Sequence, residues 1–149
     1  MPRPRPVAPI DSPDEIEQQF YEALQRGDIE RLMAVWSDDE EIVCVPPGGG
    51  RVVGAAAIRA ALEAIFSNGA IDAHPEQVRR LQTHNCAVHS VVEQIRLSTA
   101  EGPQSGWVLA TNVFVLTAQG WRLVAHHASP GPGPAGEAQE RAERGAVLH

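Results

Sequence analysis

Two adjacent histidines, His126 and His127, are the side chains of this sequence best suited to acid–base chemistry near neutral pH. They lie in a stretch predicted to be a strand, where successive side chains point to opposite faces. The two rings therefore cannot readily share one small ligand. One ring is expected to face the interior, and the other the outer face or a dimer contact; the pattern leaves open which is which. A hydrogen-bonded structural role is the first interpretation, and a pocket acid or base is the second.

Asn112 is a polar residue in the middle of an apolar run that is also predicted to be a strand. A buried amide must be hydrogen-bonded, so two interpretations stand side by side. The amide bonds either to a neighbouring side chain or backbone group, or to a ligand on the wall of a pocket. In the second case Asn112 would donate to a ligand carbonyl.

Other polar groups give weaker signals. No cluster of ligating residues at metal-binding spacing is visible, so the sequence predicts no metal and no other cofactor. His89 and Glu93 share one face of a predicted strand but lie roughly 13 Å apart along it, and neither is assigned a role. The acidic run at residues 38–41 is expected to be a solvated loop. The three glycines at 48–50 lack the lysine of a phosphate-binding loop and predict a turn.

Composition excludes several classes of protein. The chain has 149 residues and a formal charge of −7, and its basic residues form no run. It is therefore predicted to be one domain that binds neither nucleic acid nor a membrane surface. No apolar stretch approaches the ~20 residues of a membrane span, and the first residues lack the apolar core of a secretory signal. Cys44 and Cys86 are not at CxxC spacing, which favours reduced, buried thiols in a cytoplasmic protein.

Hydrophobic periodicity divides the chain into a helical half and a strand half. Ser12-Pro13 and Asp28 are helix-start signals, and Gly27 is a helix stop. Residues 1–10 are proline-rich and residues 130–136 alternate Gly and Pro, so 1–10 is expected to be a disordered tail and 131–149 a flexible tail around a domain at 11–130. The predicted helices are 13–26, 28–36 and 55–67, and the predicted strands are 41–45, 52–53, 76–84, 86–98, 106–117 and 120–128.

This order predicts an α+β fold, in which three helices pack on one face of a curved antiparallel sheet. Such a layout forms a cone with an internal pocket. The strand at 107–116 is apolar on both faces, so both faces should be covered. Because the helices can cover only one of them, a second copy of the chain is expected on the other, which predicts a homodimer.

Two stretches carry a resemblance to a known family. They are YEALQRGD…LMAVWSDDEEIVCVPPGGGRVVGAAAIRAAL in the first half and TNVFVLTAQGWRLVAHHASPGP at the end. The chain resembles the nuclear transport factor 2-like superfamily over about residues 14–130, and more narrowly its SnoaL-like and ketosteroid-isomerase-like branch. The resemblance implies a cystatin-like cone. It does not imply one reaction, because this superfamily includes isomerases, cyclases, dehydratases, epoxide hydrolases and proteins without known catalysis.

The ketosteroid isomerase residues are mostly missing when they are carried over by this resemblance. The tyrosine of the oxyanion hole falls on Phe20, with Tyr21 one step round the helix. The general base falls on Val45, and the protonated aspartic acid falls on Asn112. Valine cannot accept a proton and phenylalanine cannot donate one, so steroid isomerisation is disfavoured.

The expected pocket is mostly apolar, and two classes of function remain. The first is a protein that binds a small, largely hydrophobic, carbonyl-containing molecule. The alternative is an isomerase, cyclase or hydrolase that uses a pocket histidine as acid or base and Asn112 as carbonyl donor. A weaker third option is an accessory subunit whose tails recruit a partner. A pocket-facing titratable group with a shifted pKa would favour the enzyme. The predicted lining residues are Phe20, Trp36, Val45, Asn112, His126 and His127, and the catalytic candidates are Asn112, His126 and His127.

Overall fold

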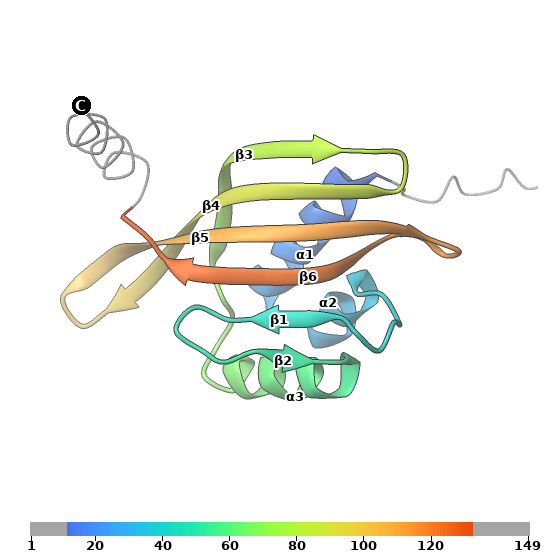
Figure 1. The fold of residues 1–149 in the computed structure, drawn as a ribbon. Helices are drawn as coiled ribbons and strands as arrows, with labels where there is room; N and C mark the ends of the chain where they lie inside the picture. Colours follow the sequence, from blue (N-terminus) through green and yellow to red (C-terminus); the bar gives the residue numbers. More distant parts are fainter. Residues whose placement is uncertain (1–11, 133–149) are drawn as a thin grey trace, which may run out of the picture.

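The computed structural model describes residues 12–132, so residues 1–10 and most of 131–149, the predicted tails, lie outside the described part. It confirms the α+β class, with helices on one face of a curved sheet (Figure 1). The elements follow in the order α1 (Pro13–Arg26), α2 (Ile29–Val35), β1 (Val43–Val45), β2 (Val52–Val53), α3 (Ala55–Phe66), β3 (Ala73–Gln82), β4 (Cys86–Thr99), β5 (Gly102–Thr117) and β6 (Gly120–Pro130).

The six strands form one sheet in the order β2-β1-β6-β5-β4-β3. Neighbouring strands are antiparallel except for β1 and β6, which run parallel. The sheet is therefore mixed rather than wholly antiparallel. A parallel pair needs a long connection, and the chain between β1 and β6 supplies one through α3 and the β3–β5 meander.

The helix boundaries follow from the capping residues. Ser12 Oγ accepts a hydrogen bond from the Glu15 backbone N–H at 3.1 Å, and Pro13 occupies the first turn of α1. Gly27 ends α1 in the left-handed conformation, with φ of 62°. Asp28 then caps α2 by accepting from the Arg31 N–H at 3.1 Å. These caps fix the direction of α1 across the sheet.

Two strands begin earlier than predicted: the edge strand β3 begins at Ala73 rather than at residue 76, and β5 begins at Gly102 rather than at residue 106. Pro75 lies within β3, and an edge strand tolerates a proline whose missing N–H would face away from the sheet. The pairing with β4 shifts register between Glu76 and Arg79, where Gln77 has a positive φ of 48°. This bulge bends β3 over the helical side of the fold (Figure 1).

The core lies between the inner face of the sheet and the helices. Its largest fully buried apolar side chains include Phe114 and Leu123 from the sheet and Leu32 and Ile58 from the helices. Strand alternation places His126 among the buried residues and leaves His127 exposed on the outer face. None of the helices between residues 12 and 132 is both long enough and apolar enough to cross a membrane.

Candidate functional site

A network of buried polar side chains joins α1 to the inner face of the sheet. Each member is at most 7% exposed, which is unusual for so many ionisable groups close together. Buried charges and polar groups are stable only when they are paired, so these side chains must satisfy one another. The six members of the network are Glu17, Tyr21, His89, Glu93, Asn112 and His126.

Secondary structure places these groups face to face. Glu17 and Tyr21 are four residues apart on α1, so they lie on one face of the helix. Across the sheet, β4 pairs His89 with Asn112, and β6 pairs Asn112 with His126. These three side chains therefore form a row across three neighbouring strands, and α1 crosses above it.

Asn112 is the centre of the network, and it is completely buried. Its amide Nδ2 donates to Glu17 Oε2 and to Tyr21 Oη, both at 3.1 Å. Its Oδ1 accepts a hydrogen bond from His126 Nδ1 at 2.6 Å. An amide oxygen can only accept, so His126 carries its proton on Nδ1 and keeps the lone pair of Nε2. Asn112 is thus paired inside the protein, which is the first of its two sequence interpretations.

Glu93 and Tyr21 form a second branch. Tyr21 Oη donates to Glu93 Oε2 at 2.7 Å. Burial is the main cause that raises the pKa of Glu93 to about 7; the Glu17 charge adds to the rise, and the Tyr21 hydrogen bond opposes it. Burial, followed by the Glu93 charge, raises the pKa of Tyr21 well above its usual value. Tyr21 therefore remains a neutral donor, and Glu93 is about half protonated at neutral pH.

His126 is shifted in the direction that keeps it neutral. Burial, and to a smaller extent the charge of His127, lowers the pKa of His126 to about 4. Its ring packs against Phe20, with the two ring centroids 4.9 Å apart. At physiological pH the imidazole is therefore an uncharged base, and its Nε2 has no hydrogen-bond partner within residues 12–132.

His126 and Glu93 both line an apolar cavity of about 70 Å³ between α1, α3 and the sheet. Among the described residues, Cys44 is the only other titratable one on its wall, and burial raises the pKa of that thiol to about 12, so it stays protonated. The cavity thus presents a neutral base and a carboxyl group to an apolar space. Its lining residues are Phe20, Leu24, Cys44, Pro46, Pro47, Leu62, Ile65, Ile71, Glu93, Ile95 and His126.

Comparison with models of known families shows the family of this chain. A model of the SnoaL-like domain matches residues 14–132. The chain belongs to the SnoaL-like family. A search of curated proteins found no match.

Solved structures similar to this SnoaL-like chain have different provisional assignments. A provisionally assigned calcium/calmodulin-dependent protein kinase type II association domain from Thiobacillus denitrificans is 31% identical, covers 85% of this chain and 99% of its own, and has a TM-score of 0.74. A provisionally assigned dehydratase of the nuclear transport factor 2-like family from Streptomyces avermitilis is 29% identical. The match covers 78% of this chain and 92% of the dehydratase chain, with a TM-score of 0.69. The calcium/calmodulin-dependent protein kinase type II hub of S. rosetta is 18% identical and shares the fold. The match covers 87% of this chain and 100% of the hub chain, with a TM-score of 0.64.

Within the SnoaL-like domain, the predicted pocket residues separate into two groups. Phe20 and His126 line the apolar cavity, and Asn112 lies behind His126. Val45 pairs with the exposed His127 rather than with His126, so neither is part of the cavity wall. Trp36 is buried in the core and does not line the cavity; its indole Nε1 has no hydrogen-bond partner among the described residues.

Four network residues were not predicted from the sequence: Glu17, Tyr21, His89 and Glu93. A signal for Glu17 was present, because its place between Ile16 and Phe20 puts it next to the apolar stripe of α1. The strand pattern puts His89 and Glu93 on one face but gives neither a partner. They do not bond to each other, and residues of α1 and β5 connect them.

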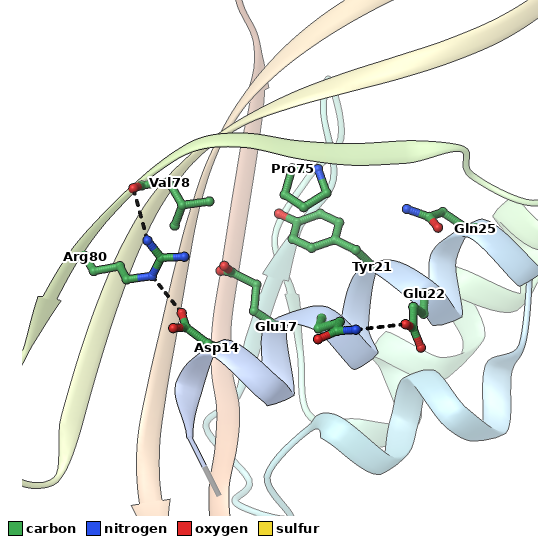
Figure 2. A pocket seen from close by; sticks show the side chains of 9 residues that line it. Asp14, Glu17, Tyr21, Glu22, Gln25, Pro75, Val78 and Arg80 are labelled. Atoms are coloured by element: carbon green, nitrogen blue, oxygen red, sulfur yellow. Dashed lines mark hydrogen bonds and ion pairs between the residues drawn. The ribbon is translucent and has the colours of Figure 1, made fainter. Parts of the chain in front are cut away.

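A second, more open hollow of about 410 Å³ lies between α1 and β3, and we call it the outer cleft (Figure 2). Glu17 and Tyr21 belong to its wall, so the network separates the outer cleft from the apolar cavity. Three side chains of types that can ligate a metal also lie close together beside this cleft. One ligand atom each from Asp14, Glu17 and His89 lies within 4.8 Å of the others. The lining residues are Asp14, Glu17, Gln18, Tyr21, Glu22, Gln25, Pro75, Val78 and Arg80.

Proposed function

We propose that this SnoaL-like domain is an acid–base enzyme that moves a proton on a small, largely apolar, carbonyl-containing molecule in the apolar cavity. One observation carries the proposal: the cavity wall holds two ionisable groups whose pKa values are shifted in opposite directions, to about 4 for His126 and about 7 for Glu93. Pairs of groups with pKa values moved apart by their surroundings are typical of acid–base sites.

His126 is the proposed base. Asn112 holds Nδ1–H, so the lone pair of Nε2 is available to remove a proton from a carbon next to the ligand carbonyl. Asn112 enters the proposal as a positioning residue and not as the carbonyl donor, because both of its amide hydrogens are already used by Glu17 and Tyr21. The apolar wall excludes water and strengthens the electrostatic interactions inside.

Glu93 is the proposed acid. In its protonated form it donates to the ligand oxygen while negative charge develops there, and it can release its proton to a departing hydroxyl group. Loss of water then balances: His126 gains the proton from carbon, the C–O bond breaks, and Glu93 supplies the proton that completes the water molecule. The similarity to the provisionally assigned dehydratase supports this reaction class, and the two side chains return to their starting protonation states by exchange with solvent.

Proton exchange at carbon tests the proposal without knowledge of the natural substrate. A panel of small ketones and 3-hydroxy carbonyl compounds is incubated with the protein in D₂O, and deuterium uptake is followed by proton NMR. We expect uptake above the buffer rate for at least one class. His126→Gln should reduce it by about 10²–10⁴-fold, whereas the matched control His127→Gln on the outer face should not.

A binding protein without catalysis is the alternative, and the same panel separates the two. Saturable binding of a carbonyl compound with no deuterium uptake in any member of the panel would contradict the enzyme proposal. If His126→Gln leaves the binding of the carbonyl compound unchanged, the compound does not bind in the apolar cavity.

The homodimer is a further part of the proposal. On β5, Val108, Ala110 and Phe114 face the helices and are buried, whereas Leu109 and Val113 on the other face remain partly exposed. A second copy that packs on this outer face would cover them. The similarity to a kinase association domain and to a hub domain supports self-assembly. Sedimentation should give twice the chain mass of 16.0 kDa, and Val113→Glu should give the monomer; a wild-type monomer would refute the dimer.

A further inference from the structure

We propose that Glu17 is a positioning residue that fixes which nitrogen of His126 is basic, although Glu17 does not line the apolar cavity and bonds to Asn112 rather than to the His126 ring. The inference rests on the proposed role of His126 as the base in that cavity. It goes beyond this role, because it names the group that keeps the His126 lone pair on Nε2. The effect passes through Asn112, which bonds to both residues.

The two ends of the Asn112 amide differ chemically, so the orientation of the amide decides the tautomer of His126. In the observed orientation, Oδ1 accepts the Nδ1–H of His126 at 2.6 Å, and the lone pair remains on Nε2. If the amide turned over, Nδ2 would face the ring instead. Nδ2 can only donate, so His126 would have to accept on Nδ1 and carry its proton on Nε2. The cavity wall would then hold an N–H group in place of a base.

Two oxygen atoms hold the Asn112 amide in the observed orientation, and both accept hydrogen bonds from its Nδ2. Glu17 Oε2 and Tyr21 Oη each lie 3.1 Å from this nitrogen. A carboxylate has no proton to donate, and Glu17 is negatively charged, since its charge is one cause of the raised pKa of Glu93. Glu17 therefore cannot form a hydrogen bond with Oδ1, and it opposes the turned-over amide.

Tyr21 cannot fix the amide in the same way, because a hydroxyl group can both donate and accept. Its proton is given to Glu93 Oε2 at 2.7 Å, which leaves Oη free to accept from Asn112. Once Glu93 is protonated, its carboxyl group can donate to Tyr21 Oη, and the Tyr21 proton can turn toward Asn112. Glu93 is about half protonated at neutral pH, so this exchange is open to Tyr21 there. Of the two partners of Nδ2, Glu17 alone keeps the same polarity.

His89 holds Glu17 in place from the sheet. Its Nδ1 lies 2.9 Å from Glu17 Oε2, the same oxygen that accepts from Asn112. These three side chains are at most 4% exposed, so water cannot readily replace either bond. Glu17 comes from α1, whereas His89 and Asn112 occupy directly paired positions on β4 and β5. The orientation of the amide is therefore set by the packing of α1 on the sheet.

The test reads the tautomer of His126 from two-bond ¹⁵N–¹H NMR spectra of the full chain, in which a protonated ring nitrogen and one with a lone pair have different ¹⁵N shifts. In the wild type we expect the proton on Nδ1 at both pH 5 and pH 8, on either side of the Glu93 pKa of about 7. Glu17→Met removes the acceptor, so the proton should move mainly to Nε2 at pH 5 but not at pH 8. Tyr21→Phe should keep the wild-type tautomer at both pH values.

Glu17→Gln is the matched control, because its amide oxygen can still accept from His89 and Asn112. It should keep the His126 proton on Nδ1. In the deuterium-uptake assay at pH 5, Glu17→Met should be at least about tenfold slower than the wild type. A base held in the wrong tautomer loses ~10²–10⁴-fold in rate.

Glu17→Met is a buried change, so circular dichroism must show that the variant folds; the wild-type and Tyr21→Phe spectra carry the test if it does not. The proposal is overturned if the wild-type tautomer changes between pH 5 and pH 8, or if Tyr21→Phe alters it. It is also overturned if Glu17→Met keeps the proton on Nδ1 at pH 5, or if Glu17→Gln loses it, which would assign the effect to altered packing at residue 17. The spectra need no substrate, so a wild-type chain without deuterium uptake would refute the proposed enzyme and not this assignment.

Discussion

The shifted carboxyl group of Glu93 should make a contribution to the stability of this protein that falls as the pH rises, which is unusual for a carboxyl group. Glu93 binds its proton more tightly in the folded state, where its pKa is about 7, than in the unfolded state, where the value is 4.5. Its contribution to stability is therefore fully present below about pH 4.5 and is lost as the pH rises through about 7. Most carboxylates in proteins act in the opposite sense, because their pKa values are lowered by folding.

The magnitude follows from the size of the shift. A rise of 2.5, from 4.5 to about 7, corresponds to about 3 kcal/mol across the whole window. The groups that face Glu93 are Tyr21 and Glu17 from α1 and, around the apolar cavity, His126 from β6 and Cys44 from β1. Of these, His126 titrates in the opposite sense. Its lowered pKa of about 4 makes stability fall as the pH drops from 6.5 towards 4, so the wild-type curve between these values should be nearly flat.

Glu93→Gln isolates the carboxyl contribution. Glutamine keeps the size of the side chain and can still accept from Tyr21 Oη, but it has no proton to lose. Urea unfolding of the wild type and the variant at pH 5 and pH 8 gives the free energy of unfolding of each. The free energy of unfolding of the variant minus that of the wild type should be about 2–3 kcal/mol larger at pH 8 than at pH 5. A difference that stays constant would refute the raised pKa of Glu93, and a difference of opposite sign would mean that Glu93 is stabilised as a carboxylate.

Three other predictions follow from the same network. Asn112→Leu should lower the free energy of unfolding by about 2–5 kcal/mol in urea titrations, because it leaves the partners of a completely buried amide unsatisfied; no loss would show that Asn112 is not the centre of the network. Tyr21→Phe should raise the pKa of Glu93 further, because it removes the hydrogen bond that lowers this pKa; a lowered value in an infrared titration of the carboxyl band would contradict the hydrogen bond. The protein should show no activity on a 3-oxo-Δ5 steroid, because the apolar cavity of about 70 Å³ has no room for a four-ring molecule and Val45 stands where the isomerase base would be; a robust rate would mean that a steroid binds and reacts elsewhere in the protein.

The order of the elements could be read from the sequence because it depends on local signals. Ser12, Gly27 and Asp28 mark helix ends through bonds made within a few residues, and the structure has the caps at these positions. The start of β3 could not be predicted, because a proline is normally taken to exclude a strand. Pro75 is tolerated only because β3 lies at the edge of the sheet, which is a property of the whole topology.

The candidate site was harder to predict because it depends on register. Alternation along a strand shows that His89 and Glu93 share a face, but it cannot show what lies opposite them. The row formed by His89, Asn112 and His126 exists only in the register observed between β4, β5 and β6. A bulge between Val113 and Phe114 shifts that register, and no turn residue in the sequence marks it. The spacing of histidines and acids along the chain is therefore a poor guide to which of them meet.

The pH dependence of proton exchange in the apolar cavity is the most direct test of the proposed enzyme. With the carbonyl compound from the panel that exchanges fastest, the rate of deuterium uptake is measured from pH 3 to pH 9. Activity requires neutral His126 and protonated Glu93, so the rate should rise through about pH 4, stay level, and fall through about pH 7. Glu93→Gln should remove the fall at high pH. A wild-type rate that keeps rising above pH 7, or the same profile after His126→Gln, would contradict the account.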